Sequence, residues 1–149
     1  MSLLKKIDND IKFAMKSKDA LSLESLRAVK SSILLFKTKS GSSNDLSDQD
    51  EIKILQKLVK QRKDSAEIYK NQNRLELCDT ELNQARIIES YLPKQLSPAE
   101  VSIIIEKIII KLNASSMKDM GKVMGIASKE LSGKSDGKTI SEIVKKKLM

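Results

Sequence analysis

The chain has 149 residues, which is enough for one ordinary domain or for one domain with a small appendage. Hydrophobic residues make up 40% and aromatic residues only 3%, so we expect an aliphatic core of Ile, Leu, Val and Met. There is no histidine, so the most common general base is missing. Cys78 is the single cysteine, which excludes an internal disulfide and a thiolate metal cage. No apolar run is long enough to span a membrane. These features predict a cytoplasmic protein with no catalytic residues, no metal, no cofactor and no membrane partner.

The net charge of +8 is unevenly distributed along the chain. Residues 1–93 hold 17 cations and 14 anions, a net charge of +3, whereas residues 94–149 hold 11 lysines and 6 acids, a net charge of +5. A basic segment of this kind fits the phosphates of a nucleic acid, an acidic protein surface or anionic lipid.

Apolar residues recur at helical spacing in four stretches before Pro93, and three of these stretches open with a residue that can cap a helix. We see no alternating strand pattern. A polar loop is expected at residues 39–44, between the second and third stretches. The predicted helices begin near Ser2, Asp19, Ser47 and Arg74, and the last two end near Asn71 and Tyr91.

The strongest helix-start signal follows Pro93, which ends the fourth helix. Ser97 can act as the N-cap, Pro98 suits the first helical position and Glu100 completes a capping box. We place the domain boundary here, with an N-terminal helical domain at residues 1–93 and a smaller C-terminal domain at residues 94–149. Three further helices are predicted, ending near Leu112, spanning Ser116–Leu131 and spanning Asp136–Leu148. The expected fold is all-α, with about four helices followed by three.

Several charged residues of the N-terminal domain fall on apolar helix faces. Buried charges persist only when they are paired, so we interpret them as a structural ion-pair network between helices. The alternative is a polar ligand site between the same helices. The network predicts that Arg62 and Glu89 lie within hydrogen-bonding reach of each other. Its members are Arg27, Lys30, Arg62, Glu81 and Glu89.

The C-terminal domain has the most informative surface. Lys118, Lys122 and Lys129 fall on one side of the predicted helix at residues 116–131, and Gly121 and Gly125 border them. Glycine in a helix interior costs about 1 kcal/mol relative to alanine, which suggests that another backbone, from RNA or from a neighbouring helix, comes close. The candidate RNA-binding residues are Lys118, Gly121, Lys122, Gly125, Lys129, Lys134, Lys138, Lys145 and Lys146.

Lysines supply phosphate affinity without reading sequence, and the segment has no aromatic platform for stacking bases. We therefore expect recognition of backbone and shape, with no DNA sequence specificity. The same lysines could instead contact an acidic protein partner.

The chain also resembles the YqeY family, whose members are similar to the C-terminal tail domain of GatB, a subunit of tRNA-dependent amidotransferases. One small departure is Asn113, which stands where glycine is common, although asparagine also tolerates a left-handed helix end. The motifs that carry the resemblance are Leu26-Arg27 with Lys30-Ser31, Val59-Lys-Gln-Arg-Lys-Asp-Ser65, Glu89-Ser-Tyr-Leu-Pro-Lys-Gln-Leu-Ser97, Ser116-Met-Lys-Asp-Met-Gly-Lys-Val-Met-Gly125 and Gly133-Lys-Ser-Asp-Gly-Lys138.

The resemblance implies an all-helical protein whose C-terminal domain faces tRNA. It also brings the family label of a carbon–nitrogen ligase with glutamine as amido-N-donor, which we interpret as inherited from the larger enzyme, because its catalytic parts have no counterpart here. The first hypothesis is a non-catalytic module that binds tRNA or another structured RNA. The second is an adaptor that docks on an amidotransferase, an aminoacyl-tRNA synthetase or another acidic partner.

Overall fold

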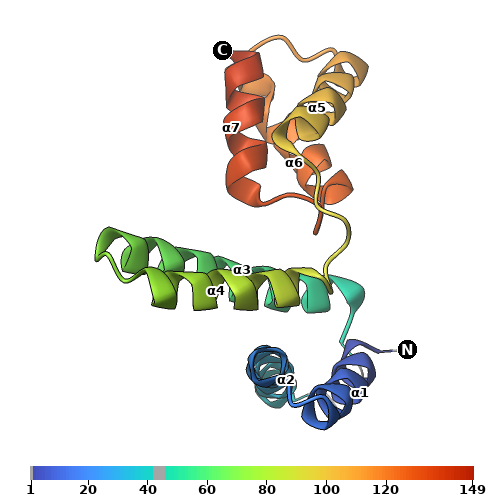
Figure 1. Ribbon diagram of the computed structural model, residues 1–149. Coiled ribbons are helices and arrows are strands. Elements are labelled where there is room, and N and C mark those ends of the chain that lie inside the picture. The colour runs from blue at the N-terminus through green and yellow to red at the C-terminus, as the bar shows by residue number, and fades with distance from the viewer. Residues whose placement is uncertain (1, 42–45) are drawn as a thin grey trace. The chain divides into compact units, whose positions relative to one another are not determined.

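The computed structural model describes residues 2–41 and 46–149, and in this part of the chain every regular element is a helix (Figure 1). The all-α class predicted from the sequence is therefore confirmed. The chain divides into two compact units, Met1–Leu92 and Pro93–Met149, each with its own buried core. The elements are α1 (Leu3–Lys16), α2 (Ala20–Ser40), α3 (Asp48–Asn71), α4 (Leu75–Glu89), α5 (Pro98–Leu112), the short 3-10 helix η1 (Met117–Asp119), α6 (Met120–Glu130) and α7 (Gly137–Leu148).

Side-chain caps explain why most of the helices begin where they do. At five helix starts, a serine or aspartate side chain accepts a hydrogen bond from the backbone N–H three residues ahead. At α5 the bond is reciprocated, because Glu100 Oε1 accepts from the backbone N–H of Ser97 at 3.3 Å, which confirms the predicted capping box. The five capping residues are Ser2, Asp19, Ser47, Ser97 and Asp136.

The first unit is built from two helical pairs. α1 packs on α2, α3 packs along α4, and α2 contacts both helices of the second pair. The core between them is aliphatic, as the composition predicted. Its most deeply buried large side chains are Ile7, Val29, Ile33, Leu55 and Ile88.

Polar contacts hold neighbouring segments of this unit onto α1. The Tyr91 hydroxyl, just beyond the end of α4, donates a hydrogen bond to the Asp10 carboxylate. Lys6 Nζ lies 5.3 Å from the centroid of the same tyrosine ring, within the range of a cation–π contact. Lys30 Nζ of α2 forms an ion pair with Asp8 Oδ1 at 2.7 Å.

In the second unit, α5, α6 and α7 enclose a separate aliphatic core. Its five largest fully buried side chains come from all three helices and from the residue that follows α6. They are Val101, Ile105, Val123, Leu131 and Val144. This core fixes which sides of α6 and α7 remain exposed.

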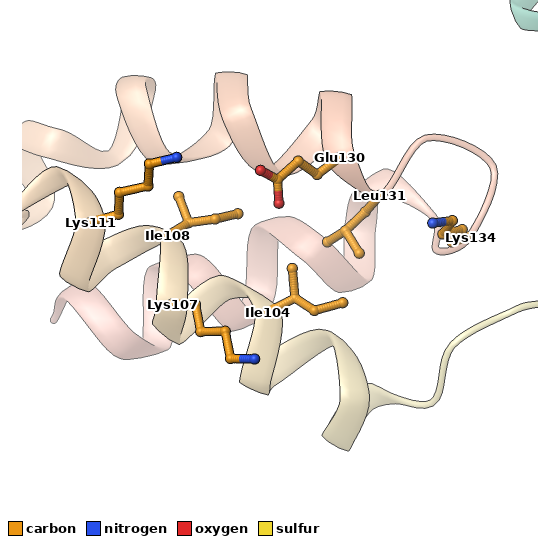
Figure 2. A pocket seen from close by; sticks show the side chains of 7 residues that line it. All are labelled: Ile104, Lys107, Ile108, Lys111, Glu130, Leu131 and Lys134. Carbon is orange, nitrogen blue, oxygen red and sulfur yellow. The ribbon is translucent and has the colours of Figure 1, made fainter.

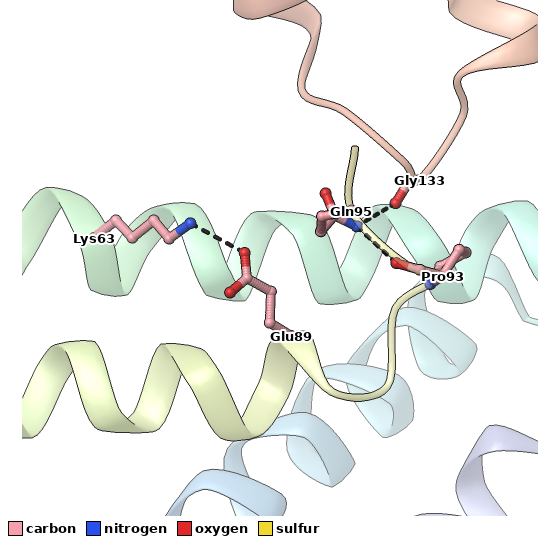
Figure 3. Close-up of polar contacts among 5 residues, drawn as sticks. All are labelled: Lys63, Glu89, Pro93, Gln95 and Gly133. Carbon is pink, nitrogen blue, oxygen red and sulfur yellow. Dashed lines mark hydrogen bonds and ion pairs between the residues drawn. The ribbon is translucent and has the colours of Figure 1, made fainter. Parts of the chain in front are cut away.

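The loop between α6 and α7 is fixed to the segment that precedes α5. Gln95 Nε2 donates to the carbonyl oxygens of Gly133, at 2.5 Å, and Pro93, at 2.9 Å (Figure 3). The backbone N–H of Leu96 donates to the Lys134 carbonyl oxygen at 2.9 Å. Gly133 has φ = 77°, a left-handed conformation that favours glycine, so the residue type suits this turn.

Two helix ends differ from the sequence prediction. α2 continues to Ser40 and ends at Gly41, which has φ = 65°, so the predicted loop at residues 39–44 begins later; residues 42–45 lie outside the described residues. α4 ends at Glu89 rather than near Tyr91. Helical periodicity marks the apolar face of a helix but does not fix its last turn, where left-handed or turn conformations take over.

Candidate nucleic-acid interface

The exposed side of α6 carries the centre of the predicted basic surface. Val123 and Ala127 are fully buried and fix the inner side of the helix. Helical periodicity places Lys122, Gly125 and Lys129 on the opposite side, and all three are exposed. We call these three residues the α6 row. It presents two ammonium groups, one on each side of a position that lacks a side chain.

The two glycines of this region lie in open surroundings. A Cβ atom added at Gly121 or at Gly125 would meet nothing within 4 Å. Close packing against another described helix therefore does not explain either glycine, which removes one of the two alternatives that the sequence left open. Gly125 lies inside α6, where glycine is less favourable than alanine by about 1 kcal/mol.

Lys118 is exposed, but it does not belong to the same helix as Lys122 and Lys129. The single helix predicted at residues 116–131 is divided into η1 and α6. The Ser116 hydroxyl accepts a bond from the Lys118 backbone N–H at 3.4 Å, and Asp119 Oδ2 accepts from the Ser115 backbone N–H at 3.0 Å. These local bonds favour a tight 3-10 turn, so the 100° periodicity of α6 does not extend back to Lys118.

A second set of exposed lysines lies along α7. Ile140, Val144 and Leu148 are buried, and by periodicity Lys138, Lys145 and Lys146 lie on the outer side, interrupted by Glu142. Lys134 lies in the preceding loop and lines a groove described below (Figure 2).

None of the seven lysines in the candidate set forms an ion pair with a described residue. The neighbouring Lys147 behaves differently, since its Nζ lies 3.7 Å from Glu106 Oε2. The positive charge of the candidate surface is therefore not neutralised within the described part of the chain, and it remains available to an anion. The seven, which we call the unpaired lysines, are Lys118, Lys122, Lys129, Lys134, Lys138, Lys145 and Lys146.

Arg62 and Glu89, which were expected to contact each other, have different partners in the structure. Arg62 Nε donates to Gln84 Oε1 at 3.1 Å, and its Nη1 donates to the Leu58 carbonyl oxygen at 3.2 Å. Glu89 accepts from Lys63 Nζ at 3.0 Å (Figure 3). Among the described residues, these three contacts replace the expected contact between Arg62 and Glu89. The Gln84 side-chain amide and the Leu58 carbonyl accept from the Arg62 guanidinium, and Lys63 donates to the Glu89 carboxylate.

The other members of the predicted network are placed differently. Lys30 pairs with Asp8, a residue that the sequence interpretation did not single out. Arg27 is exposed and Glu81 is half-buried, and neither forms an ion pair with a described residue. The structure thus has separate pairwise contacts between helices in place of one connected network.

Two further basic features were missed by the sequence reasoning. Lys53, Lys57 and Lys60 are exposed on one side of α3, and their helical spacing could have revealed them. Lys107 and Lys111 of α5 line the same groove as Lys134. That grouping joins α5 to a loop more than twenty residues away, so no local sequence pattern could indicate it.

The described residues contain no group of three or more histidine, cysteine, aspartate or glutamate side chains placed to hold a metal ion. Cys78 is buried. No described helix is both long enough and apolar enough to cross a membrane.

Comparison with known families gives a match to the family described as Yqey-like protein over residues 4–148. The chain belongs to this family. The match covers both units, in agreement with the motifs noted in the sequence.

The chain is also similar to proteins named altered inheritance of mitochondria protein 41, mitochondrial. The protein from Clavispora lusitaniae is 29% identical over 130 residues, which cover 87% of this chain and 74% of that protein. The protein from Kluyveromyces lactis is 36% identical over 141 residues, covering 90% and 69% respectively. The protein from Meyerozyma guilliermondii is 38% identical over 92 residues, covering 60% and 46%.

These names contradict the expectation of a cytoplasmic protein, because all three relatives are named as mitochondrial. The expectation rested on a single cysteine and on the absence of a long apolar run. Neither feature specifies a compartment.

Proposed function

We propose that this YqeY-like protein is a non-catalytic RNA-binding module, with tRNA as its most suitable ligand. The observation that carries the proposal is the α6 row, in which two unpaired lysines lie on either side of an open glycine. The remaining unpaired lysines add to the positive charge of the same unit. The proposed ligand is recognised through its phosphates and its shape.

The charge balance of the second unit supports a polyanionic ligand. The unit has 11 lysines and 6 acids, and seven of the lysines are unpaired among the described residues. Each lysine that contacts a phosphate releases condensed counterions, which drives association without base recognition. The unit contains no aromatic residue, so stacking on unpaired bases is not expected.

The open glycines fit the same ligand. Gly121 and Gly125 have no side chains, and the space next to each is open. A sugar-phosphate backbone can therefore approach the helix closely near Lys118, Lys122 and Lys129. The conformational cost of the two glycines is then offset by binding rather than by internal packing.

The family relationship supports a setting in aminoacyl-tRNA metabolism. YqeY-like proteins resemble the tail domain of GatB, and that tail contacts tRNA in the amidotransferase. We assign no amidotransferase activity to this chain, since it has no histidine, the most common general base, and its single cysteine, Cys78, is buried. A carbon–nitrogen ligase reaction would belong to the larger enzyme.

The proposal is tested by titrating the full chain against bulk tRNA at low salt, with two matched charge-reversal variants. The first variant is Lys118→Glu/Lys122→Glu/Lys138→Glu in the second unit. The second is Lys12→Glu/Lys53→Glu/Lys57→Glu, which changes three exposed lysines of the first unit and alters the net charge equally. We expect micromolar or tighter binding by the unaltered chain, and an affinity at least about tenfold lower for the first variant than for the second.

Equal losses in the two variants would mean that net charge alone drives binding, and the assigned surface would be wrong. Failure of the folded, unaltered chain to bind tRNA at low salt would refute the RNA-binding function itself.

A further inference from the structure

A groove in the second unit has chemistry that nucleic-acid binding does not use. It lies between α5 and the C-terminal end of α6, has a volume of about 420 Å³ and is open to solvent. Three aliphatic side chains, Ile104, Ile108 and Leu131, form its floor (Figure 2). The polar residues that line it are Lys107, Lys111, Glu130 and Lys134.

The α5 side of the groove follows from helical spacing. Ile104, Lys107, Ile108 and Lys111 are spaced i, i+3, i+4 and i+7, so they share one side of the helix. Ile108 is almost fully buried, Ile104 is partly buried, and both lysines are exposed. An apolar strip and two cations therefore run together along the groove.

The opposite edge is held in place by hydrogen bonds. Lys134 follows Gly133 in the loop whose carbonyl groups accept from Gln95 Nε2 and from the Leu96 backbone N–H. The loop is therefore fixed to the segment that leads into α5. The groove is formed before a ligand arrives, which lowers the entropic cost of binding.

The charges of the groove favour an acidic ligand. Three lysines face a single carboxylate, Glu130, and none of the three forms an ion pair with a described residue. A nucleic acid would gain from the lysines, but it has no aliphatic group for the floor of Ile104, Ile108 and Leu131. A helix with aliphatic anchors and flanking carboxylates would satisfy both the floor and the rim.

We propose that this groove is a docking site for an acidic amphipathic helix of another protein. One or two large aliphatic side chains of that helix bind against Ile104, Ile108 and Leu131. Its carboxylates pair with Lys107, Lys111 and Lys134. The groove contains no residue of the α6 row and shares only Lys134 with the unpaired lysines, so this proposal does not rest on RNA binding.

The test uses the full chain and a synthetic helical peptide of about 16 residues, a length at which isolated helices begin to be stable. The peptide carries leucines at positions i, i+3 and i+4 with glutamates on both sides. A matched peptide has lysine in place of every glutamate. Affinity is measured by fluorescence anisotropy, and the contacted residues are mapped by amide chemical shifts. We expect the acidic peptide to bind at least about tenfold more tightly than the matched peptide, with shifts at Ile104, Lys107 and Lys111.

Two double variants with equal charge changes separate this site from the RNA surface. Lys107→Glu/Lys111→Glu should lower the affinity for the acidic peptide by at least about tenfold and leave tRNA binding nearly unchanged. Lys122→Glu/Lys129→Glu should have the opposite effects. Ile104→Ala, which keeps every charge, should weaken the peptide by roughly tenfold through lost apolar burial.

Three outcomes would overturn the inference. The unaltered chain could fail to bind the acidic peptide. Both double variants could lose the peptide equally, which would mean that attraction is general rather than local. The groove variant could lose tRNA and retain the peptide, which would identify RNA as the occupant of the groove.

Discussion

At the scale of single residues, Asn113 shows how a side chain fits a demanding backbone position. It follows α5 with φ = 54° and ψ = 38°, the left-handed conformation that ends many helices. Asparagine tolerates this conformation better than alanine does, and glycine tolerates it best. The asparagine of this chain therefore meets the geometric requirement of the left-handed helix end.

Substitution at Asn113 tests that explanation. We expect Asn113→Ala to lower the free energy of unfolding by about 1 kcal/mol, because a Cβ-bearing residue without a compensating polar side chain is strained at positive φ. Asn113→Gly should leave stability nearly unchanged. Both are measured by urea denaturation, and equal stability of the alanine and glycine variants would contradict the left-handed cap.

Tyr91 links a single ionisation to the stability of the first unit. Burial raises the pKa of its hydroxyl well above the usual value near 10, and the hydrogen bond to Asp10 and the negative charge of that carboxylate raise it further. The unfolded tyrosine loses its proton near pH 10, whereas the folded one keeps it. The stabilisation is therefore complete below pH 10 and is lost as the pH rises above it.

We accordingly expect the free energy of unfolding to fall more steeply above pH 10 in the unaltered chain than in Tyr91→Phe. Paired denaturation curves at several alkaline pH values provide the measurement, and the difference between the two proteins removes the contribution of the lysines. Parallel pH profiles would show that Tyr91 titrates normally in the folded state.

At the scale of helices, the sequence predicted most elements because local signals and tertiary packing agree. The caps at Ser47 and Ser97 lie where they were expected, and α3 ends at Asn71 as predicted. The division between η1 and α6 was missed, because serine and aspartate side chains favour a tight turn that the apolar periodicity does not record. The Lys63–Glu89 pair was also missed, because the interpretation considered only charges on apolar helix faces, and Lys63 is an exposed residue.

Gly125 connects helix energetics to the proposed function. Its position is open, so Gly125→Ala should raise the free energy of unfolding by about 0.5–1 kcal/mol through better helix propensity. The same change should weaken tRNA binding, because a methyl group would stand where the backbone approaches. Denaturation and tRNA titration of one purified variant give both values.

Ser128→Ala is a suitable control, because it changes an exposed residue of the same helix outside the α6 row. It should leave tRNA affinity unchanged. An unaltered affinity in Gly125→Ala would refute the close approach, although the lysines could still bind phosphate.

At the scale of the whole chain, helical periodicity and cap signals predicted the all-α class. Composition predicted the aliphatic core and the charge excess after residue 93. It could not foretell which lysines are unpaired, since that depends on where acids from other helices lie. Glu106 neutralises Lys147, for example, while Lys145 and Lys146 form no ion pair with a described residue. The groove along α5 could not be predicted from the sequence either, because its residues come together only when α5 and α6 pack.

The most direct test of RNA binding through the second unit is the salt dependence of tRNA affinity in three proteins. These are the unaltered chain, Lys122→Ala and the control Lys53→Ala. We expect log Kd to rise linearly with log salt concentration, and Lys122→Ala should reduce the slope by about 0.7–0.9, the value for one lost phosphate contact. Lys53→Ala should leave the slope unchanged. Identical slopes in all three proteins would contradict the assignment of the α6 row as a phosphate-binding surface.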